Sequence, residues 1–414
     1  MKIEWKNSKK LKPEVILKKI NGIMTVSAEG NVSFEGFEYH DAVAALQSMI
    51  NYPESVAWLS REIFLYKAIS DAARKGTLDR DKVIAELNAI LNSKLTQKEQ
   101  TYYLLTSISI ASPLPEKVVN IGACKIKIFE GEYPKKFISR TNLVSDLAQK
   151  NFGRGVDHRP QGYSGVIVSL KSKSADWAAS ECLKAIDILR AVWCTAANSS
   201  MEFGADEWSP INRIRLGGVH TVHNEDGTLA SDTFWYEPNF VLAHPHRVLA
   251  HSVTELRKYY KNYFSKIEKS KYSNVIKDSL LRYVRALDES DQNTALIRLW
   301  GAMEELLSPN GANYDLVTRR CSFLFKERDY HRQLLEHLRE YRNANIHAGE
   351  QSETVKTLCY QLQFYFLHLI KFHLSNSKIF ESLVQANEFL DLPTDQNILE
   401  MRRKLIDKAI RFTA

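Results

Sequence analysis

The feature that most constrains the fold is a change of sequence pattern near Pro245. Before this proline, runs of β-branched residues at 118–130 and 164–170 alternate with helical patterns, and Asp226-Gly227 between two alternating segments predicts a hairpin. After it, apolar residues recur at helical spacing only. The chain is therefore expected to be an α+β protein, with a mixed α/β unit at residues 1–247 and an all-α unit at residues 248–414.

Helical periodicity places the main helices of both units. In the first unit, the pattern is helical from about Ser60 to Ser109, with a break between Gly76 and Asp79, and again from Ser174 to Ala197. Short connections between the helices of the second unit favour antiparallel neighbours, so an up-and-down bundle is expected there. Its helices are predicted near 248–268, 273–288, 293–307, 314–326, 329–342, 354–374, 379–390 and 396–412.

Charge and cysteine usage restrict the class of protein. The formal charge is +7, and lysines and arginines crowd the N-terminus and the stretch 257–277, which favours an anionic partner, nucleic acid first. Either run alone is also typical of a solvated helix face. The five cysteines are odd in number and include no C-x-x-C pair, so neither a disulfide framework nor a cysteine zinc site is expected. With no secretion signal and no long apolar segment, we expect a cytoplasmic protein without a membrane partner.

The residues best suited to chemistry are Arg342, Asn343 and His347, in the pattern R-N-x-x-x-H. They fall where the periodic helix is expected to end, just before Gly349. In an uninterrupted helix Asn343 and His347 share a face, whereas Arg342 and His347 lie about 140° apart, so a loosened backbone is expected to turn Arg342 toward the same cleft. The bare spacing R-x4-H is not specific, because it recurs at 215–220 and 332–337.

Together with the upstream helix ALIRLWGAMEELL at 295–307, this motif resembles the HEPN ribonucleases, in particular the Apea-like group, over roughly residues 276–374. The resemblance implies a helical-bundle endoribonuclease that needs no metal or other cofactor, with Arg342, His347 and Asn343 at its catalytic site. It also implies that Glu304, the closest match to the family's acidic helix residue, supports them. Glu305 as the inward residue, or a solvated Glu304, remain alternatives.

Oligomeric state and role follow from the same resemblance. The family pairs two domains so that two motifs line one cleft, and this chain has one credible copy, so a homodimer with a composite site is implied. A toxin or antiviral defence role of the abortive-infection kind is implied as well, with residues 1–247 restraining the nuclease or binding a phage or cellular trigger.

These residue types suit RNA cleavage by transesterification. Imidazole titrates near neutral pH and can accept the 2′-hydroxyl proton or protonate the leaving oxygen. Guanidinium is always charged and offers paired donors to the charge that builds on the phosphorane. The expected products are a 2′,3′-cyclic phosphate and a 5′-hydroxyl, and DNA is expected to resist cleavage because it lacks the 2′-hydroxyl.

Other candidates are weaker. Arg257, Lys258 and Lys261, among tyrosines, have the composition of an RNA-binding surface, but their spacing also fits a helix that packs on the core. The histidines at 220, 223, 244, 246 and 251 lack the partners and spacing of a metal site, so none is expected. Two functions from other classes stay open: a catalytically silent HEPN-like module that binds RNA or a nucleotide, and a purely structural interaction protein.

Overall fold

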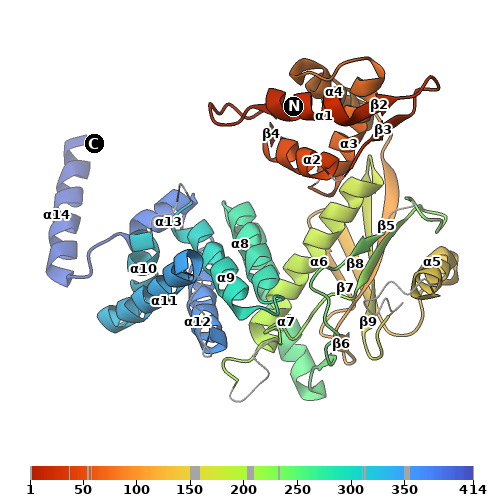
Figure 1. Cartoon of the computed structure of the whole chain (residues 1–414). Coiled ribbons are helices and arrows are strands. Elements are labelled where there is room, and N and C mark those ends of the chain that lie inside the picture. Colours follow the sequence, from red (N-terminus) through yellow and green to blue (C-terminus); the bar gives the residue numbers. More distant parts are fainter. Residues whose placement is uncertain are drawn as a thin grey trace.

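A computed structural model of the chain describes residues 2–36, 38–53, 56, 58–149, 159–202, 209–231, 234–309, 311, 314–348 and 355–413. For residues 58, 59, 148, 149, 314 and 346–348 it describes the backbone only. Within these ranges the chain is α+β, with a small N-terminal module, an antiparallel sheet and a group of helices that follows it (Figure 1).

The N-terminal module has a hydrophobic core of its own, built from side chains between Ile3 and Leu91. The predicted break between its last two helices is confirmed, because Asp79 caps the second helix by accepting a hydrogen bond from the Lys82 amide at 2.8 Å. The helices are α1 (Pro13–Ile23), α2 (Glu38–Ser48), α3 (Trp58–Arg74) and α4 (Arg80–Leu95), and two small sheets join β1 (Glu4–Trp5) to β4 (Ile50–Asn51) and β2 (Met24–Val26) to β3 (Val32–Phe34).

A six-stranded antiparallel sheet forms the centre of the molecule, in the order β11-β10-β5-β9-β8-β7. Its longest pairing joins β5 (Gln100–Ile108) to β9 (Ser164–Ser172). The helical pattern expected up to Ser109 is therefore wrong beyond α4. Residues 104–108 are buried on both faces of β5, and such a continuous apolar run has the same periodicity in a buried strand and a buried helix. The other strands are β7 (Val118–Ile121), β8 (Cys124–Phe129), β10 (Val219–His223) and β11 (Trp235–Tyr236), and a separate parallel pair joins β6 (Ile110–Ala111) to β12 (His246–Arg247).

The hairpin predicted at Asp226-Gly227 is confirmed, since β10 and β11 pair antiparallel on either side of it. Gly227 has a φ of +91°, and a Cβ there would collide with the Lys136 carbonyl, so only glycine fits. Lys136 belongs to a short 3-10 turn (Lys135–Phe137) that leads into α5 (Ile138–Gln149) on the outer face of the sheet.

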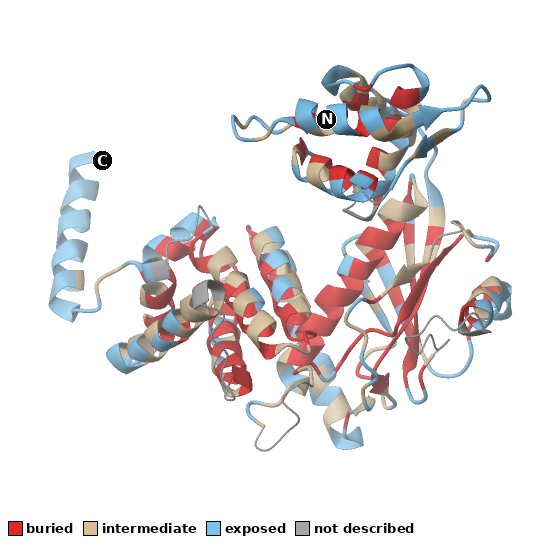
Figure 2. Ribbon diagram, in the orientation of Figure 1, coloured by how far each residue is buried: buried red, intermediate tan, exposed pale blue. Residues whose placement is uncertain are grey.

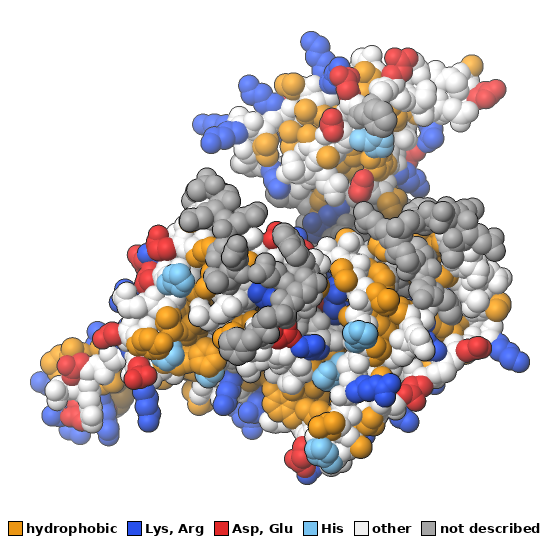
Figure 3. Space-filling model, turned by 60° about the horizontal axis from the view of Figure 1, so that its bottom comes forward, with side chains coloured by type: hydrophobic (Ala, Val, Ile, Leu, Met, Phe, Trp, Pro, Cys, Tyr) orange, Lys and Arg blue, Asp and Glu red, His pale blue; other side chains and the backbone are white. Residues whose placement is uncertain are grey.

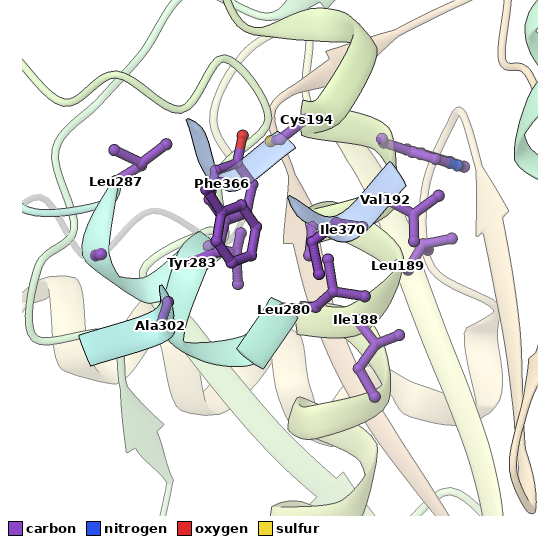
Figure 4. Close-up of a cluster of buried hydrophobic side chains, with 14 of the residues drawn as sticks. Ile188, Leu189, Val192, Cys194, Leu280, Tyr283, Leu287, Ala302, Phe366 and Ile370 are labelled. Carbon is purple, nitrogen blue, oxygen red and sulfur yellow. The ribbon is translucent and has the colours of Figure 1, made fainter. Parts of the chain in front are cut away.

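The opposite face of the sheet is covered by the predicted long helix, α6 (Ala175–Ala197), which is buried along nearly its whole length (Figure 2). Figure 4 shows Ile188, Leu189 and Val192 of α6 gathered with Phe366 and Ile370 of a later helix. One hydrophobic core thus runs from the sheet through α6 into the C-terminal helices. The boundary predicted near residue 247 does not coincide with a break in packing.

A buried ionic network crosses the same junction. Arg190 of α6 is fully buried and contacts Asp187 at 2.6 Å and Asp288 at 2.9 Å. Arg285 contacts Asp187 at 2.6 Å and Glu237, which follows β11, at 2.8 Å. Because Glu237 follows the sheet while Asp187 and Arg190 belong to α6 and Arg285 and Asp288 lie in and just after α8 (Ser273–Ala286), the network couples the sheet to the helices.

The C-terminal helices match their predicted positions to within a few residues, with one exception. Helix α11 was expected to end at about Arg342 and instead continues to Ala348. No helix among the described residues is both long and apolar enough to cross a membrane. The helices are α7 (Val253–Lys269), α8 (Ser273–Ala286), α9 (Gln292–Leu307), α10 (Tyr314–Ser322), α11 (Arg328–Ala348), α12 (Val355–Ser375), α13 (Leu383–Leu390) and α14 (Gln396–Thr413), and a 3-10 turn (Ala250–Ser252) precedes α7.

Candidate active site

Helices α9 and α11 are joined by hydrogen bonds next to the R-N-x-x-x-H motif. The side-chain oxygen of Asn293, in the first turn of α9, accepts from the Tyr341 hydroxyl at 2.8 Å and from the Asn345 amide at 2.9 Å. Asp291 caps this end of α9 by accepting from the backbone amides of Asn293 and Thr294. The motif is therefore attached to a helix end that is itself well ordered.

These bonds explain why α11 continues past Arg342, where the sequence pattern predicted its end. Tyr341 and Asn345 are one helical turn apart, so both reach the same acceptor only if the backbone between them stays helical. The tertiary contact stabilises α11 beyond the point where its apolar stripe stops. The loosened backbone that was expected to redirect Arg342 is therefore absent from the described part of α11.

The side chain of Arg342 contacts that of Asn343 without any break in the helix. Its Nη1 donates to Oδ1 of the neighbouring Asn343 at 3.1 Å, and both residues are half-buried. Position 347 lies one turn beyond Asn343 on the same side of the helix backbone. The side chain of His347 itself lies outside the described residues. The structure thus brings the side chains of Arg342 and Asn343 together and places the backbone of His347 one turn beyond Asn343, about 140° around α11 from that of Arg342.

Glu304 of α9 lies within electrostatic reach of Arg342. Its carboxylate accepts a hydrogen bond from the indole of the buried Trp300 at 2.9 Å, which fixes its orientation. Burial raises the pKa of Glu304, and the charge of Arg342 and the Trp300 hydrogen bond oppose that rise. Glu305 instead pairs with Arg282 at 3.1 Å on the side toward α8. The charge of Arg342 thus acts on Glu304, and Glu305 is held by a different arginine.

Comparison with family models, curated proteins and solved structures gives no match to this chain. The resemblance to HEPN ribonucleases rests on the residues of α9 and α11, and membership of that family stays a prediction.

The three basic residues proposed for RNA binding lie on α7, against the sheet end of the molecule and apart from α11 (Figure 1). Each already has an acidic partner: Arg257 and Lys261 pair with Glu116, and Lys258 pairs with Glu255. Arg257 also donates to the Pro115 carbonyl at 2.8 Å. The structure does not bring these residues together with Arg342.

The aromatic residues of α7 distinguish between the two interpretations of its spacing, an RNA-binding surface and a helix that packs on the core. Tyr260 and Tyr263 are buried in the core, as in a helix that packs on its neighbours, while Tyr259 is exposed. A continuous row of stacking rings on the surface of α7 is therefore not formed.

Two of the histidines weighed as metal ligands have protein partners. His220 lies 2.7 Å from the Thr106 hydroxyl, and burial lowers its pKa. His223 contacts the Gly227 carbonyl at 3.0 Å, and burial lowers its pKa to about 4. Among the described side chains, no group of three or more His, Cys, Asp or Glu is placed to hold a metal ion.

The residues that position the motif, Asn293, Tyr341 and Asn345, were not among those predicted from the sequence. The spacing of Tyr341 and Asn345, four residues apart with one polar donor each, was a usable signal that they share a face. Their common acceptor could not be found that way, because Asn293 is 48 residues from Tyr341 in the sequence.

Proposed function

We propose that this protein is a metal-independent endoribonuclease of the HEPN type, whose site comprises Arg342, Asn343 and His347 with Glu304 in support. The observation that carries the proposal is the hydrogen bond from Arg342 to Asn343, because it joins the guanidinium to the residue that lies one helical turn before position 347. The electrostatic link from Glu304 of a second helix supports it.

In the proposed reaction the ribose 2′-hydroxyl loses a proton and attacks the adjacent phosphorus, and the bond to the 5′-oxygen breaks. The imidazole of His347 accepts the first proton or supplies the one that the leaving oxygen takes up. Arg342 stabilises the negative charge on the phosphorane oxygens. Asn343 positions the guanidinium, and the half-buried setting of both residues reduces screening by water.

A single motif supplies one imidazole, whereas the reaction needs two proton transfers. A second copy of the chain, related by a twofold axis, would supply the second imidazole, so we propose a homodimer with a composite site. A role in toxin-like antiviral defence is part of the same proposal. The N-terminal module, which has its own core, suits a separate unit that binds a phage or cellular trigger.

The test compares the full chain with Arg342→Ala and His347→Ala in EDTA, using labelled RNA and DNA of one sequence. Matched controls come from the same helix: Arg332→Ala and His337→Ala reproduce the R-x4-H spacing outside the motif. We expect both motif variants to lose cleavage by a factor of about 100 or more, and both controls to retain it.

End-group analysis should find 2′,3′-cyclic phosphate and 5′-hydroxyl termini on RNA, and intact DNA. Cleavage that survives both motif substitutions would refute the assignment of the site. RNA binding by the wild-type chain without cut products would favour the alternative, a catalytically silent RNA- or nucleotide-binding module.

A further inference from the structure

The C-terminal helix α14 is exposed along its whole length. It contains 18 residues, none of them buried, and it stands away from the rest of the molecule in Figures 1 and 2. Several of its large apolar side chains are among the most exposed of the chain, with Leu405 at 61%, Ile406 at 60% and Phe412 at 82%. A helix with this much exposed apolar surface is suited to bind a partner.

The two sides of α14 differ strongly in character. At about 100° per residue, its apolar side chains cover about half of the circumference, and its basic and acidic side chains cover the other half. Arg402 is the exception, because it lies near the middle of the apolar half, and no ion pair of Arg402 is found among the described residues. The apolar half comprises Ile398, Leu399, Met401, Leu405, Ile406, Ala409, Ile410 and Phe412.

The linker before α14 is attached to the body of its own molecule. Asp391 forms ion pairs with Arg319 at 2.7 Å and with Arg320 at 2.6 Å, and the Thr394 hydroxyl accepts from Arg328 at 2.9 Å. Asp395 then caps α14 through the Asn397 amide at 2.7 Å. With the linker held by these contacts, α14 stands away from its own α13, so the structure favours a partner from another molecule.

A complementary surface is present on α13 of the same chain. Val384 is 58% exposed; the exposed Glu388 lies one helical turn beyond it, and the exposed Glu381 lies just before the N-cap Ser382. Within the described ranges neither carboxylate has an ion pair. Phe389, 41% exposed, lies about 140° around α13 from Val384 and contacts the rings of Phe323 and Phe372. Figure 3, which brings the bottom of the molecule forward, shows further hydrophobic side chains on the surface of the helical unit.

The position of Arg402 distinguishes between classes of partner. A lipid surface would place this guanidinium at the centre of the inserted face, which is costly in hydrocarbon. Two α14 helices packed face to face would place two such arginines together. A protein surface with an apolar centre and unpaired carboxylates satisfies both the apolar half and the charge.

We propose that α14 of each copy docks on the α13 surface of a second copy, with Arg402 paired to Glu388 or Glu381. The exchange is reciprocal, so the two arms close a symmetric dimer. This inference does not depend on the proposed ribonuclease activity, because its test measures association alone.

The first experiment measures the mass of the full chain by analytical ultracentrifugation across a concentration series. We expect a dimer whose dissociation constant rises by at least about tenfold in Leu405→Glu, as for loss of one interface hot spot. Lys404→Glu, on the polar half of α14, is the matched control and should leave association unchanged. Arg402→Glu should weaken the dimer, and adding Glu388→Arg should restore it.

The second experiment locates the contact by disulfide trapping. All five native cysteines are buried, so introduced cysteines are the accessible thiols. Chains carrying Arg402→Cys are mixed with differently tagged chains carrying Glu388→Cys, and we expect a crosslink between the two kinds of chain.

Other outcomes would overturn the proposal. These are a wild-type chain that stays monomeric, crosslinks only between two Arg402→Cys chains, or a crosslink confined to one chain when it carries both substitutions. Binding of the monomer to anionic vesicles that depends on Leu405 would assign α14 to a lipid surface instead.

Discussion

Substitution of Asn293 by alanine tests whether a single acceptor maintains the last turns of α11. The substitution removes the oxygen that accepts from Tyr341 at 2.8 Å and from Asn345 at 2.9 Å. A hydrogen bond of this kind contributes about 0.5 to 1.5 kcal/mol, so the two together contribute about 1 to 3 kcal/mol. Because they hold one end of a helix, we expect the loss to appear as local opening. Amide hydrogens of residues 341–348 should exchange about 5- to 150-fold faster in Asn293→Ala.

Hydrogen exchange followed by mass spectrometry measures this effect on peptides from α11, with peptides from α6 as the internal reference. Tyr341→Phe removes one of the two donors and should give roughly half the change in opening free energy. If the motif performs the chemistry, RNA cleavage should fall in the same order. Unchanged exchange at residues 341–348 in Asn293→Ala would refute the reasoning, since it would mean that α11 extends to Ala348 without this contact.

Three further predictions concern charged groups. Glu304→Gln should maintain or raise the midpoint of thermal unfolding at neutral pH, because burial penalises the charged carboxylate. The same substitution should lower RNA cleavage. A lower unfolding midpoint would contradict this prediction. Arg190→Met should lower the free energy of unfolding in urea by about 3 to 5 kcal/mol, because Asp288 loses its closest ion pair and the buried Asp187 keeps only Arg285. Burial opposes ionisation of Glu237, but His220 and Arg285 prevail and hold the pKa of its carboxyl below its usual range. The ionised carboxylate of Glu237 therefore stabilises the folded state above a pH of about 4.3, and this stabilisation is lost as the pH falls further. The free energy of unfolding of Glu237→Gln should therefore depend less on acidification over that range than that of the wild type.

The C-terminal helices could be predicted because their evidence is local. Side chains such as Leu296, Trp300 and Met303 recur at helical spacing and are all buried in α9. A helix needs one apolar stripe and two ends, and residues close together in the sequence determine both. The same holds for α4, where Asp79 marked the start.

Strand β5 shows where local evidence fails. Leu104 and Leu105 are both fully buried, on opposite faces of the sheet, because α6 covers one face and the segment with Tyr133 and Phe137, which leads into α5, covers the other. A segment covered on both sides loses the alternation that distinguishes a strand. The conformation of β5 is therefore decided by the segments that pack on the two faces of the sheet.

Residue types and short-range spacing by themselves determined the helices, the hairpin at Gly227 and the candidate chemistry of Arg342, Asn343 and His347. The tertiary structure decided that α11 stays helical to Ala348, since that depends on Asn293 of another helix. It likewise decided that α6 joins the sheet and the later helices in one core. The physical reason is the same in both cases. Hydrogen bonds and burial between distant segments outweigh local preferences of a few tenths of a kcal/mol per residue, and the sequence does not display which distant segments will meet.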